Sequence, residues 1–550
     1  MDWGSGAHQS ASGGGETAPT GQSVVLLDGK ASHPRELLGN KGHSVDRMRR
    51  HNLPVPPAFC ITTEVGLRYL ADPAATMDVI WPDVLDRMSW LEAEVSRTFG
   101  HGPRPLLVSV RSGATQSMPG MMDTVLNVGM NDTAEQALAA DSGDPAFARD
   151  THRRFTRMYE RIVGGSDQVV VPDDPYVQLR AGIEAVFASW NSPRAVAYRA
   201  HYGIDDRHGT AVVVQAMVFG NHGPNSGAGA FFSRDPITGD NEPFGEWLPG
   251  GQGDDVVSGS LDVEPITALR DEQSAVYDEL VDAARTLERL ESDIQEIEFT
   301  VEDGKLWLLQ ARAAERSAQA AVRLALQLRH EGLIDDSETL RRVTPAHVRA
   351  LLIPALQPEI RLAAPLLAKG LPACPGVVSG KAYTDVDEAL LAAERGEAVI
   401  LVRDHTRPED VSGMLAAQGI VTEVGGAASH AAVLSRELGR VAVVGCGQGV
   451  TASLAGQHIT VDGTEGEVRE GILSLSAWSE NDTPELRELA DIARRISPLR
   501  AHASGDHPRL DDTSEAAVRA ALGSGHTDVV SPVPLILMLT ALRLARQAAS

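Results

Sequence analysis

Short runs of apolar residues, each of the length of a β-strand, recur along the chain and lead into glycine-containing segments. Leu106–Val110 (LLVSV) and Ala211–Val218 (AVVVQAMV) are two such runs, and valine is frequent in both. β-Branched residues in runs of this length are typical of strands. Elsewhere, as in THRRFTRMYERIV, residues of one kind recur at helical spacing. The pattern therefore predicts an α/β protein.

The segment IQEIEFTVEDGKLWLLQAR predicts a β-hairpin that turns at its Glu-Asp-Gly sequence. Two registers are open. A two-residue Asp-Gly turn pairs Ile297 with Gln310 and mixes polar with apolar side chains on each face. A three-residue loop, with Gly304 in the left-handed conformation, pairs Val301 with Lys305 instead.

We prefer the three-residue loop because it makes one face of the hairpin a nearly continuous apolar layer. That face contains Ile297, Phe299, Val301, Trp307, Leu309 and Ala311. The other face holds Glu296, Glu298, Gln310 and Arg312, with Leu306 and Leu308 nearer the turn. Carboxylate and amide oxygens suit Mg²⁺, and a guanidinium group binds phosphate at two points. An exposed hairpin face with an incidental ion pair is the alternative.

Two further segments place basic residues beside glycines. The run LLVSV leads into Arg111, and a Ser-Gly pair and a Met-Pro-Gly-Met-Met turn follow it. Lys41 lies in LGNKG, ahead of a helical pattern. Glycines let the backbone approach a ligand closely, and free N–H groups suit phosphate oxygens. Ordinary surface turns explain the same pattern. In a third glycine-flanked segment, SGAGAFFSRDPITG, we interpret Arg234 and Asp235 as a structural pair.

Four arginines lie at helical spacing in THRRFTRMYERIV and share a broad helix face. They are Arg153, Arg154, Arg157 and Arg161. A solvated helix face is one interpretation of this stripe, and a surface that faces an anion or docks another domain is the other.

His430 follows a strand (Ile420, Val421) and a diglycine, in the first turn of a short helix predicted from about Ser429 to Leu438. An imidazole nitrogen is a competent nucleophile toward a phosphoryl group, and the helix N-terminus would stabilise the anion formed on it. Neither a cysteine nor a second histidine lies at metal-ligand spacing here, which argues against zinc. A histidine that only caps or packs the helix start is the alternative.

Composition shifts divide the 550 residues into five segments. A Gly-, Ser- and Thr-rich tail, expected to be disordered, precedes a large α/β segment, a helical linker, a second α/β segment and a polar, helical tail. Their bounds are 1–22, 23–315, 316–365, 366–475 and 476–550.

Charge and cysteine content exclude several classes of protein. Lys and Arg number 49 against 75 Asp and Glu, a net charge of −26, so general nucleic-acid binding is not expected. Cys60, Cys374 and Cys446 are too scattered for a disulfide framework, and they indicate a reducing cytoplasm. The apolar run Val533–Leu542 is too short to cross a bilayer, so no membrane association is expected. The N-terminus lacks the features of a signal peptide.

Eight segments together resemble the pyruvate, phosphate dikinase family, one of the dikinases that phosphorylate a carrier histidine. They follow the family's order over residues 24–475. The segments are LLGNKGHSVDRM, LPVPPAFCITTE, LLVSVRSGATQSMPGMMDTVLNVGMND, SRDPITG, GQGDDVVSG, IEFTVEDGKLWLLQAR, LPACPGVVSG and GGAASHAAVLSRELG.

The resemblance implies an N-terminal ATP-grasp domain over 23–315 and a swivelling phosphohistidine domain over 366–475. The family's ATP- and Mg²⁺-site positions fall on Lys41, Arg111, Glu296, Glu298, Gln310 and Arg312, with Glu296, Glu298 and Gln310 as the metal ligands. Gly120 falls in the loop that covers the phosphates. Arg154 falls where the two domains dock, and His430 on the phosphorylated histidine.

The implied half-reaction moves the β,γ-diphosphoryl unit of ATP onto His430 and releases AMP. Phosphate then removes the outer phosphoryl group as pyrophosphate and leaves phosphorylated His430, whose phosphoryl group is destined for pyruvate and phosphoenolpyruvate chemistry. Two alternatives stay open. One is a related dikinase that uses another acceptor, and the other is a regulatory protein that binds nucleotide without turnover.

The sequence departs from the family pattern in four ways. Glu296 replaces the usual Asp, Asn40 replaces a Gly beside Lys41, and Ala428 replaces a hydroxyl residue, commonly Thr. The family's C-terminal β/α barrel is not recognisable either. Residues 476–550 resemble at most its first β-α-β unit, so the acceptor site is expected to be absent or supplied by a separate barrel-domain protein.

Overall fold

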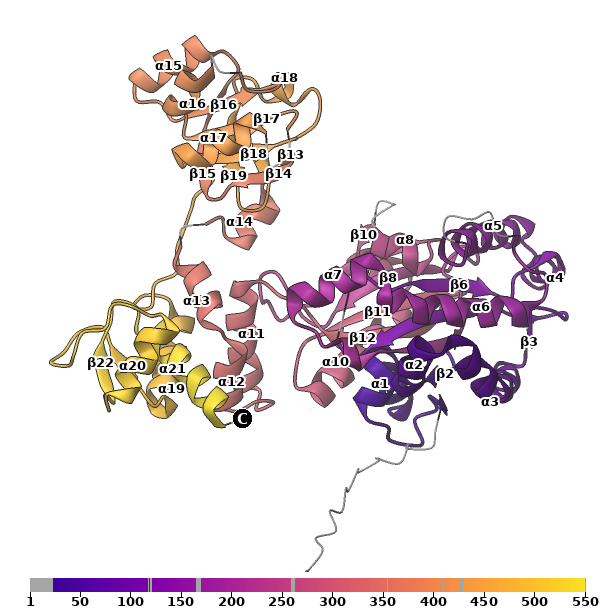
Figure 1. Cartoon of the computed structure of the whole chain (residues 1–550). Helices are drawn as coiled ribbons and strands as arrows, with labels where there is room; N and C mark the ends of the chain where they lie inside the picture. Colours follow the sequence, from indigo (N-terminus) through magenta and orange to yellow (C-terminus); the bar gives the residue numbers. More distant parts are fainter. Residues whose placement is uncertain are drawn as a thin grey trace, which may run out of the picture. The chain divides into compact units, whose positions relative to one another are not determined.

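The computed structural model describes residues 23–549, except 117, 119–120, 165–169, 259–262, 354, 408–409 and 426–428 (Figure 1). The chain forms two compact units. The first unit comprises the chain up to Ser233 together with Phe244–Glu291 and Gln295–Ala313. The second unit comprises the remainder, so each is built from segments that are separate in the sequence.

One sheet of the first unit has five antiparallel strands in the order β1-β2-β7-β5-β6. Their bounds are β1 Val24–Leu26, β2 Ala58–Ile61, β5 Val108–Ala114, β6 Thr124–Val128 and β7 Thr210–Ala216. Both predicted apolar runs contribute to central strands, and β5 extends beyond its run as far as Ala114.

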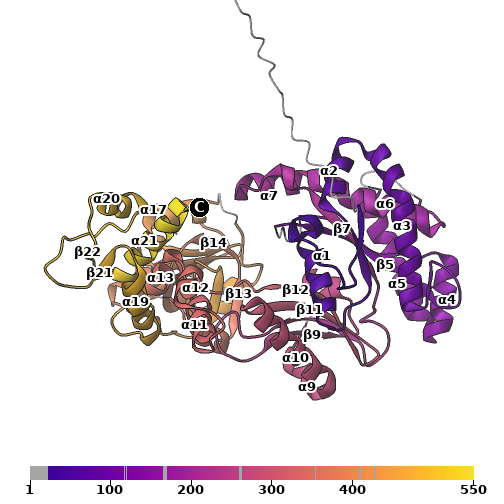
Figure 2. The same ribbon diagram turned by 90° about the horizontal axis from the view of Figure 1, so that it is seen from below.

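Both faces of this sheet are covered by helices, which explains why β7 is apolar from Ala211 to Val214. Val212 and Val214 pack in one core with helices of the outer face, whereas Ala211 and Val213 pack on the other side with α1 (Arg35–Arg50). The outer helices are α2 Thr63–Ala71, α3 Pro73–Val95, α5 Pro145–Ile162 and α6 Pro175–Ala188. Figure 2 shows α1 on one side of β5 and β7, and α3, α5 and α6 on the other. A strand buried on both faces is apolar over most of its length.

The second sheet of this unit has the strand order β10-β9-β8-β11-β12. Its strands are β8 Gly227–Phe232, β9 Phe244–Pro249, β10 Glu264–Pro265, β11 Gln295–Glu302 and β12 Lys305–Ala313. Helices α9 (Ile266–Glu272) and α10 (Ser274–Glu291) share an apolar core with this sheet. Within that core the rings of Trp247 and Phe299 are stacked, with centroids 5.9 Å apart. The same core includes α1, so α1 lies against both sheets.

The predicted hairpin is β11–β12, but its turn is the two-residue one. Glu302 pairs with Lys305, and both Asp303 (φ 50°) and Gly304 (φ 74°) are left-handed. Two consecutive positive φ angles define the turn type that matches the twist of a hairpin. The preferred three-residue loop is therefore wrong, because the backbone accommodates Asp303 as well as Gly304 in the left-handed region.

A β-bulge shifts the register between Glu298 and Phe299 of β11. Phe299 pairs with Leu308 and Glu298 pairs with Gln310, so Leu309 is an extra residue on β12. The two-residue turn and the bulge together correct the predicted faces. The buried apolar layer consists of Ile297, Phe299, Val301, Leu306, Leu308 and Ala311, whereas Trp307 and Leu309 are only half-buried.

The second unit contains an eight-stranded mixed sheet in the order β13-β20-β19-β15-β16-β17-β18-β14. Its strands are β13 Leu366–Lys369, β14 Leu371–Cys374, β15 Val377–Tyr383, β16 Val399–Arg403, β17 Gly419–Thr422, β18 Val441–Val444, β19 His458–Asp462 and β20 Glu467–Glu470. Strands β15, β16, β17 and β18 are parallel neighbours. One face packs on α15 (Val386–Glu394), α16 (Val411–Ala416) and α17 (His430–Leu438).

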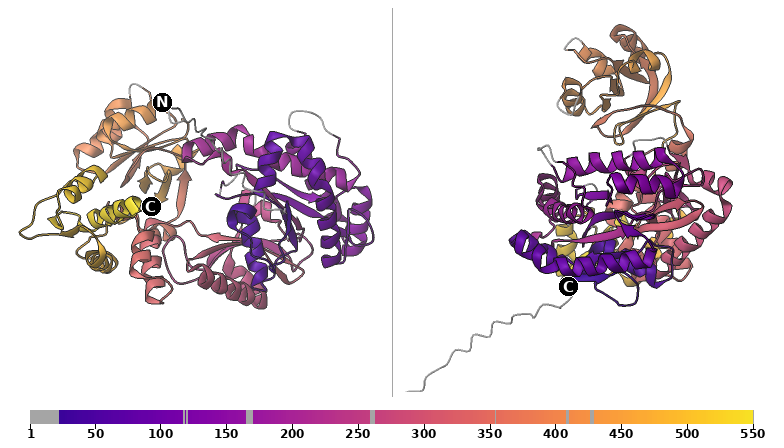
Figure 3. Two further views of the ribbon diagram at one scale, coloured as in Figure 1. Left: turned by 60° about the horizontal axis from the view of Figure 1, so that its bottom comes forward. Right: turned by 90° about the vertical axis from the view of Figure 1, so that its right-hand side faces the viewer.

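Of the segment 476–550, expected to be a weakly patterned tail, residues 476–549 are folded into a helical part of the second unit (Figure 3, yellow). They share one apolar core with helices of the expected linker. The helices are α11 Ala318–His330, α12 Asp336–Arg342 and α13 Pro345–Leu352 of the linker, and α19 Pro484–Ile496, α20 Glu515–Gly523 and α21 Pro534–Ala549. The parallel strands β21 (Arg500–His502) and β22 (Asp528–Val530) flank α20 in sequence and form a β-α-β unit.

The apolar run Val533–Leu542 lies mostly in α21 and is buried in this core. Among the helices that the structure describes, none has the length and apolar character needed to span a bilayer.

Two short segments, Arg234–Pro243 and Ser292–Ile294, are separated in the sequence from the rest of the second unit and are joined to it by ion pairs. Arg234, which is 3% exposed, forms a two-point ion pair with Glu331, at 2.6 and 2.8 Å. The carboxylate of Asp293 accepts hydrogen bonds from Arg316 at 2.7 and 2.9 Å. The neighbouring Asp235 accepts hydrogen bonds through Oδ1 from backbone N–H groups two and three residues further on, so both members of the predicted structural pair have contacts within the second unit.

Helix α1 is broken at Gly39, where φ is 64° and ψ is 176°. A Cβ at Gly39 would lie 1.6 Å from the carbonyl oxygen of Gly113 in β5. Only glycine fits this position, because a side chain would overlap the strand. The break places Lys41 in the first turn of the helix that follows it.

We expect Gly39→Ala to lower the free energy of unfolding of the first unit by more than about 2 kcal/mol, because both the left-handed conformation and the overlap are costly. Gly203→Ala is the matched control, since Gly203 has the same φ of 64° but no atom within 4 Å of its added Cβ. That change should cost only about 1 kcal/mol. Urea unfolding followed by tryptophan fluorescence measures both. Equal losses would contradict the close approach as the cause.

Candidate functional site

Arg111 of β5 connects the two sheets of the first unit. Its Nη1 donates to Gln215 Oε1 and to the carbonyl oxygen of Leu309, both at 3.2 Å. Its Nη2 donates to Glu298 Oε2 at 3.3 Å and to Gln310 Oε1 at 3.2 Å. The bulge residue Leu309 thus contributes its carbonyl group to the cluster, and the guanidinium group is held by four acceptors.

Lys41 brings a second positive charge to the same place. It is half-buried, and burial together with the nearby Arg111 lowers the pKa of its amine to about 8, an effect that Arg312 adds to and Glu298 opposes. Within the described part of the chain, no acceptor forms a hydrogen bond with this amine. Binding of a polyanion would stabilise a cation held under these conditions.

The hairpin supplies the remaining polar groups. Arg312 Nη2 donates to Glu296 Oε1 at 2.7 Å, and these two residues are direct partners in the ladder. Glu298 and Gln310 are the next pair on the same face of the hairpin, and the pair Ile297 and Ala311 lies between the two. The bulge is what places all four on a common face, because without it Gln310 and Arg312 would lie opposite Ile297 and Gln295.

The oxygens of Glu298 and Gln310 fit a Mg²⁺ ion chemically. They are hard donors, and both lie within hydrogen-bonding distance of one guanidinium nitrogen of Arg111. Glu296, the longer replacement for Asp, forms an ion pair with Arg312 two residue pairs further along the hairpin. The longer side chain of Glu296 is used to form this ion pair. The side chain of Asn40 accepts a hydrogen bond from Arg35 Nε, so it closes a contact across the break in α1.

The structure brings six of the sequence-predicted site residues together. Those gathered in the first unit are Lys41, Arg111, Glu296, Glu298, Gln310 and Arg312. Gly120 and Ala428 lie outside the described residues. His430 belongs to the second unit.

His430 is the first residue of α17, which follows the parallel strand β17. The hydroxyl group of Ser429 accepts a hydrogen bond from the N–H of Ala432 at 3.3 Å, so Ser429 caps the helix N-terminus. The segment after the carboxyl end of a parallel strand is a common place for ligand binding in α/β sheets. The predicted helix is confirmed, with its start one residue later than expected.

Arg154 forms ion pairs inside the first unit. Its Nε donates to Asp150 Oδ2 at 2.7 Å, and its Nη1 donates to Asp255 Oδ1 at 2.9 Å. Asp255 lies in α8 (Gly253–Ser258), so Arg154 joins α5 to the GQGDD segment. The guanidinium group of Arg154 therefore has a structural role within the first unit.

Gln215 is a participant that the sequence interpretation missed. It is a buried amide in β7, and it connects Arg111 to the carbonyl group of Pro56 at 3.1 Å. A signal was present, because Gln215 is the only polar residue of the run AVVVQAMV. A buried polar side chain requires a partner, so an isolated amide within an apolar strand points to a specific interaction.

Comparison with known proteins matches two parts of the chain to family models. Residues 74–278 match "Pyruvate phosphate dikinase, AMP/ATP-binding domain", and residues 396–466 match "PEP-utilising enzyme, mobile domain". Arg111 lies in the first of these ranges and His430 in the second.

Curated relatives extend the similarity over most of the chain. Pyruvate, phosphate dikinase of Clostridium symbiosum is 37% identical over 90% of this chain and 63% of its own length. The Rhizobium meliloti (strain 1021) enzyme of that name is 38% identical over 85% of this chain and 59% of its own. The chloroplastic Zea mays enzyme 1 is 37% identical, with 89% and 57% covered. The chain thus spans less than two thirds of the length of these relatives.

We expect the amine of Lys41 to titrate near pH 8, below the roughly 10.4 of a free lysine side chain. Amine labelling over a pH series, read by mass spectrometry of the Lys41 peptide, measures the midpoint independently of how accessible the amine is. The exposed Lys369 serves as the internal reference. Glu298→Gln removes the charge that opposes the shift, so the midpoint should fall further. A midpoint at the free-lysine value would contradict the electrostatic arrangement.

Proposed function

Because the chain is a pyruvate, phosphate dikinase-like protein, we propose that it is an ATP-dependent phosphotransferase. Its first unit is an ATP-grasp domain that binds MgATP between its two sheets. The eight-stranded sheet of the second unit belongs to a swivelling domain, and His430 of that domain carries the transferred phosphoryl group. The observation that carries this proposal is the joining of Lys41, Arg111 and the β11–β12 carboxylates at one place.

The cationic side chains bind and orient the phosphates of ATP. Arg111 is suited to a two-point contact with phosphate oxygens, because a guanidinium group presents its donors in a planar fork. Lys41 provides a mobile point charge, and phosphate binding returns its amine to the fully charged form. Arg312 extends the positive region along the hairpin. A ligand phosphate competes with Glu298 and Gln310 for Arg111 and frees their oxygens.

Glu298 and Gln310 would hold Mg²⁺, with Glu296 as a further carboxylate. The ion, when bound, neutralises charge on the phosphate oxygens during transfer. The chain's own contribution is positioning, since the hairpin ladder and the bulge fix these oxygens relative to Arg111. Positioning of this kind removes much of the entropic barrier to transfer.

His430 attacks the β-phosphorus of ATP through an imidazole nitrogen, and the bond between that phosphorus and the oxygen of AMP breaks. Phosphate then attacks the outer phosphorus of the diphosphoryl group, and the bond between that phosphorus and the bridging oxygen breaks. Pyrophosphate is released, and the inner phosphoryl group stays on His430. The capped N-terminus of α17 favours the negative charge that stays on His430. Pyruvate is the proposed acceptor by analogy with the relatives' name.

We expect ATP labelled at the β-phosphorus, given with Mg²⁺ and phosphate, to produce AMP and to leave acid-labile, base-stable label on the protein. His430→Asn should abolish both. His458→Asn is the matched control, since His458 is an exposed histidine of the same sheet, and it should label normally. Label that persists in His430→Asn would contradict the carrier role.

Arg111→Lys keeps the charge but removes the planar fork, and we expect it to slow labelling at least about a hundredfold.

Omitting phosphate separates the proposed reaction from that of a water-coupled dikinase, because only the proposed one needs phosphate to form pyrophosphate. Adding pyruvate to the labelled protein then tests the acceptor. Transfer of the label to phosphoenolpyruvate supports pyruvate, and retention on the protein excludes it for this chain.

A further inference from the structure

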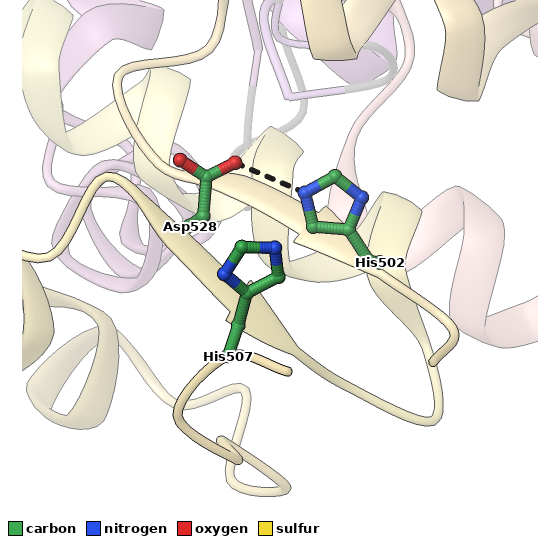
Figure 4. Close-up of side chains that lie close together, drawn as sticks. All are labelled: His502, His507 and Asp528. Carbon is green, nitrogen blue, oxygen red and sulfur yellow. Dashed lines mark hydrogen bonds and ion pairs between the residues drawn. The ribbon is translucent and has the colours of Figure 1, made fainter. Parts of the chain in front are cut away.

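A second cluster of ligand-type side chains lies in the helical part of the second unit, outside the phosphotransfer residues. His502 ends β21, His507 lies in the loop that follows, and Asp528 begins β22. One ligand atom from each lies within 4.8 Å of those of the other two. Figure 4 shows the three side chains directed toward one another.

The backbone holds these three residues in fixed positions. β21 and β22 pair in parallel, with Arg500 opposite Asp528 and His502 opposite Val530. The chain that follows His507 returns to the other edge of β22, where Pro508 O accepts from Val530 N at 2.9 Å and Leu510 N donates to Val530 O at 2.8 Å. Three adjacent backbone segments therefore supply one side chain each.

The alternation along the strands directs the cluster away from the core. Ala501 and Val529 are buried in the apolar core, so their neighbours His502 and Asp528 lie on the opposite, accessible face. The side chain of His502 is 32% exposed and that of Asp528 is 19% exposed. His507 is exposed in its loop. Solvent and ions can reach the site.

The ion pair between Asp528 and His502 does not explain why the imidazole of His507 lies beside them. Asp528 Oδ1 lies 3.0 Å from His502 Nε2, while Oδ2 accepts from Arg500 at 2.6 Å and from Thr527 at 3.0 Å. These contacts hold the pKa of Asp528 below its ordinary value, so the carboxylate stays ionised. The ring of His507 lies against that of His502, with centroids 5.0 Å apart and planes at 24°, yet it has no hydrogen-bond partner among the described residues.

We propose that His502, His507 and Asp528 form a binding site for a divalent transition-metal ion, Zn²⁺ in particular. Two imidazole nitrogens and one carboxylate oxygen are ligands that zinc accepts, with water completing the coordination. Two ligand atoms bound to one tetrahedral zinc are roughly 3.3 Å apart, close to the separation of His502 Nε2 and Asp528 Oδ1. Mg²⁺ and Ca²⁺ prefer oxygen donors and fit less well.

The ion would bind the neutral form of His502 through Nε2, with the ring proton on Nδ1. Arg500 keeps its contact with the other carboxylate oxygen of Asp528. Because His507 is on the loop and the other two ligands are on strands, the metal links residues 503–507 to the β21–β22 pair. This role does not depend on phosphotransferase activity.

The test uses the full chain, freed of metal by dialysis against a chelator and titrated with Zn²⁺ in excess Mg²⁺. We expect wild type to bind Zn²⁺ at this site and His507→Ala to weaken that binding at least about tenfold. His526→Ala is the matched control, since His526 is exposed and precedes β22 without belonging to the cluster. It should bind as wild type does. Failure of wild type to bind Zn²⁺, or equal binding by His507→Ala, would overturn the proposal.

Hydrogen exchange provides a second readout that does not depend on the binding isotherm. Zn²⁺ should slow amide exchange in residues 503–507 of wild type and of His526→Ala, but not of His507→Ala. His502→Gln removes a different ligand and should behave as His507→Ala does. Exchange in the loop that is unchanged by Zn²⁺ in wild type would contradict the proposed link.

Discussion

The one-residue offset within the β11–β12 hairpin is the constraint on which the candidate site depends. Near the turn, the ladder is set by the left-handed pair Asp303 and Gly304, and the apolar side chains then face the core. Beyond Leu309 the offset places Glu298 opposite Gln310 without changing which face of β11 is buried. The bulge therefore satisfies two demands at once: a continuous core at one end of the hairpin and a polar cluster at the other.

The candidate site gathers positive charges, although the chain as a whole is negatively charged. The protein carries a net charge of −26, yet Lys41, Arg111 and Arg312 lie close enough to influence one another, and the pKa of Lys41 is lowered. Repulsion among these cations is stored in the folded state, because the hairpin carboxylates offset only part of it. Under the proposed function, the phosphates of ATP relieve the repulsion, so binding draws on energy already present in the folded protein.

Much of the fold and of the candidate site could be predicted from the sequence, and the failures have physical reasons. Strands β5 and β7 are visible as valine-rich runs, and the hairpin is visible from its Asp-Gly turn. The bulge was not predictable, because alternation alone allowed either Trp307 or Leu308 on the apolar face. Gln215 contacts Arg111 only because β5 and β7 are neighbours, a pairing between residues about a hundred positions apart that local patterns do not encode. His502 and Asp528 likewise meet only through the parallel pairing of β21 with β22.

The discontinuity of the second unit has a consequence for how such a protein is inherited. Arg234 and Asp293 belong to that unit through buried or half-buried ion pairs, although the first unit's segments surround them in the sequence. A gene fragment that begins near residue 314 therefore lacks two of the contacts that hold its product together. Recombination at that point would exchange an incomplete unit, so the two units are expected to have been passed on and modified as one genetic block rather than as interchangeable modules.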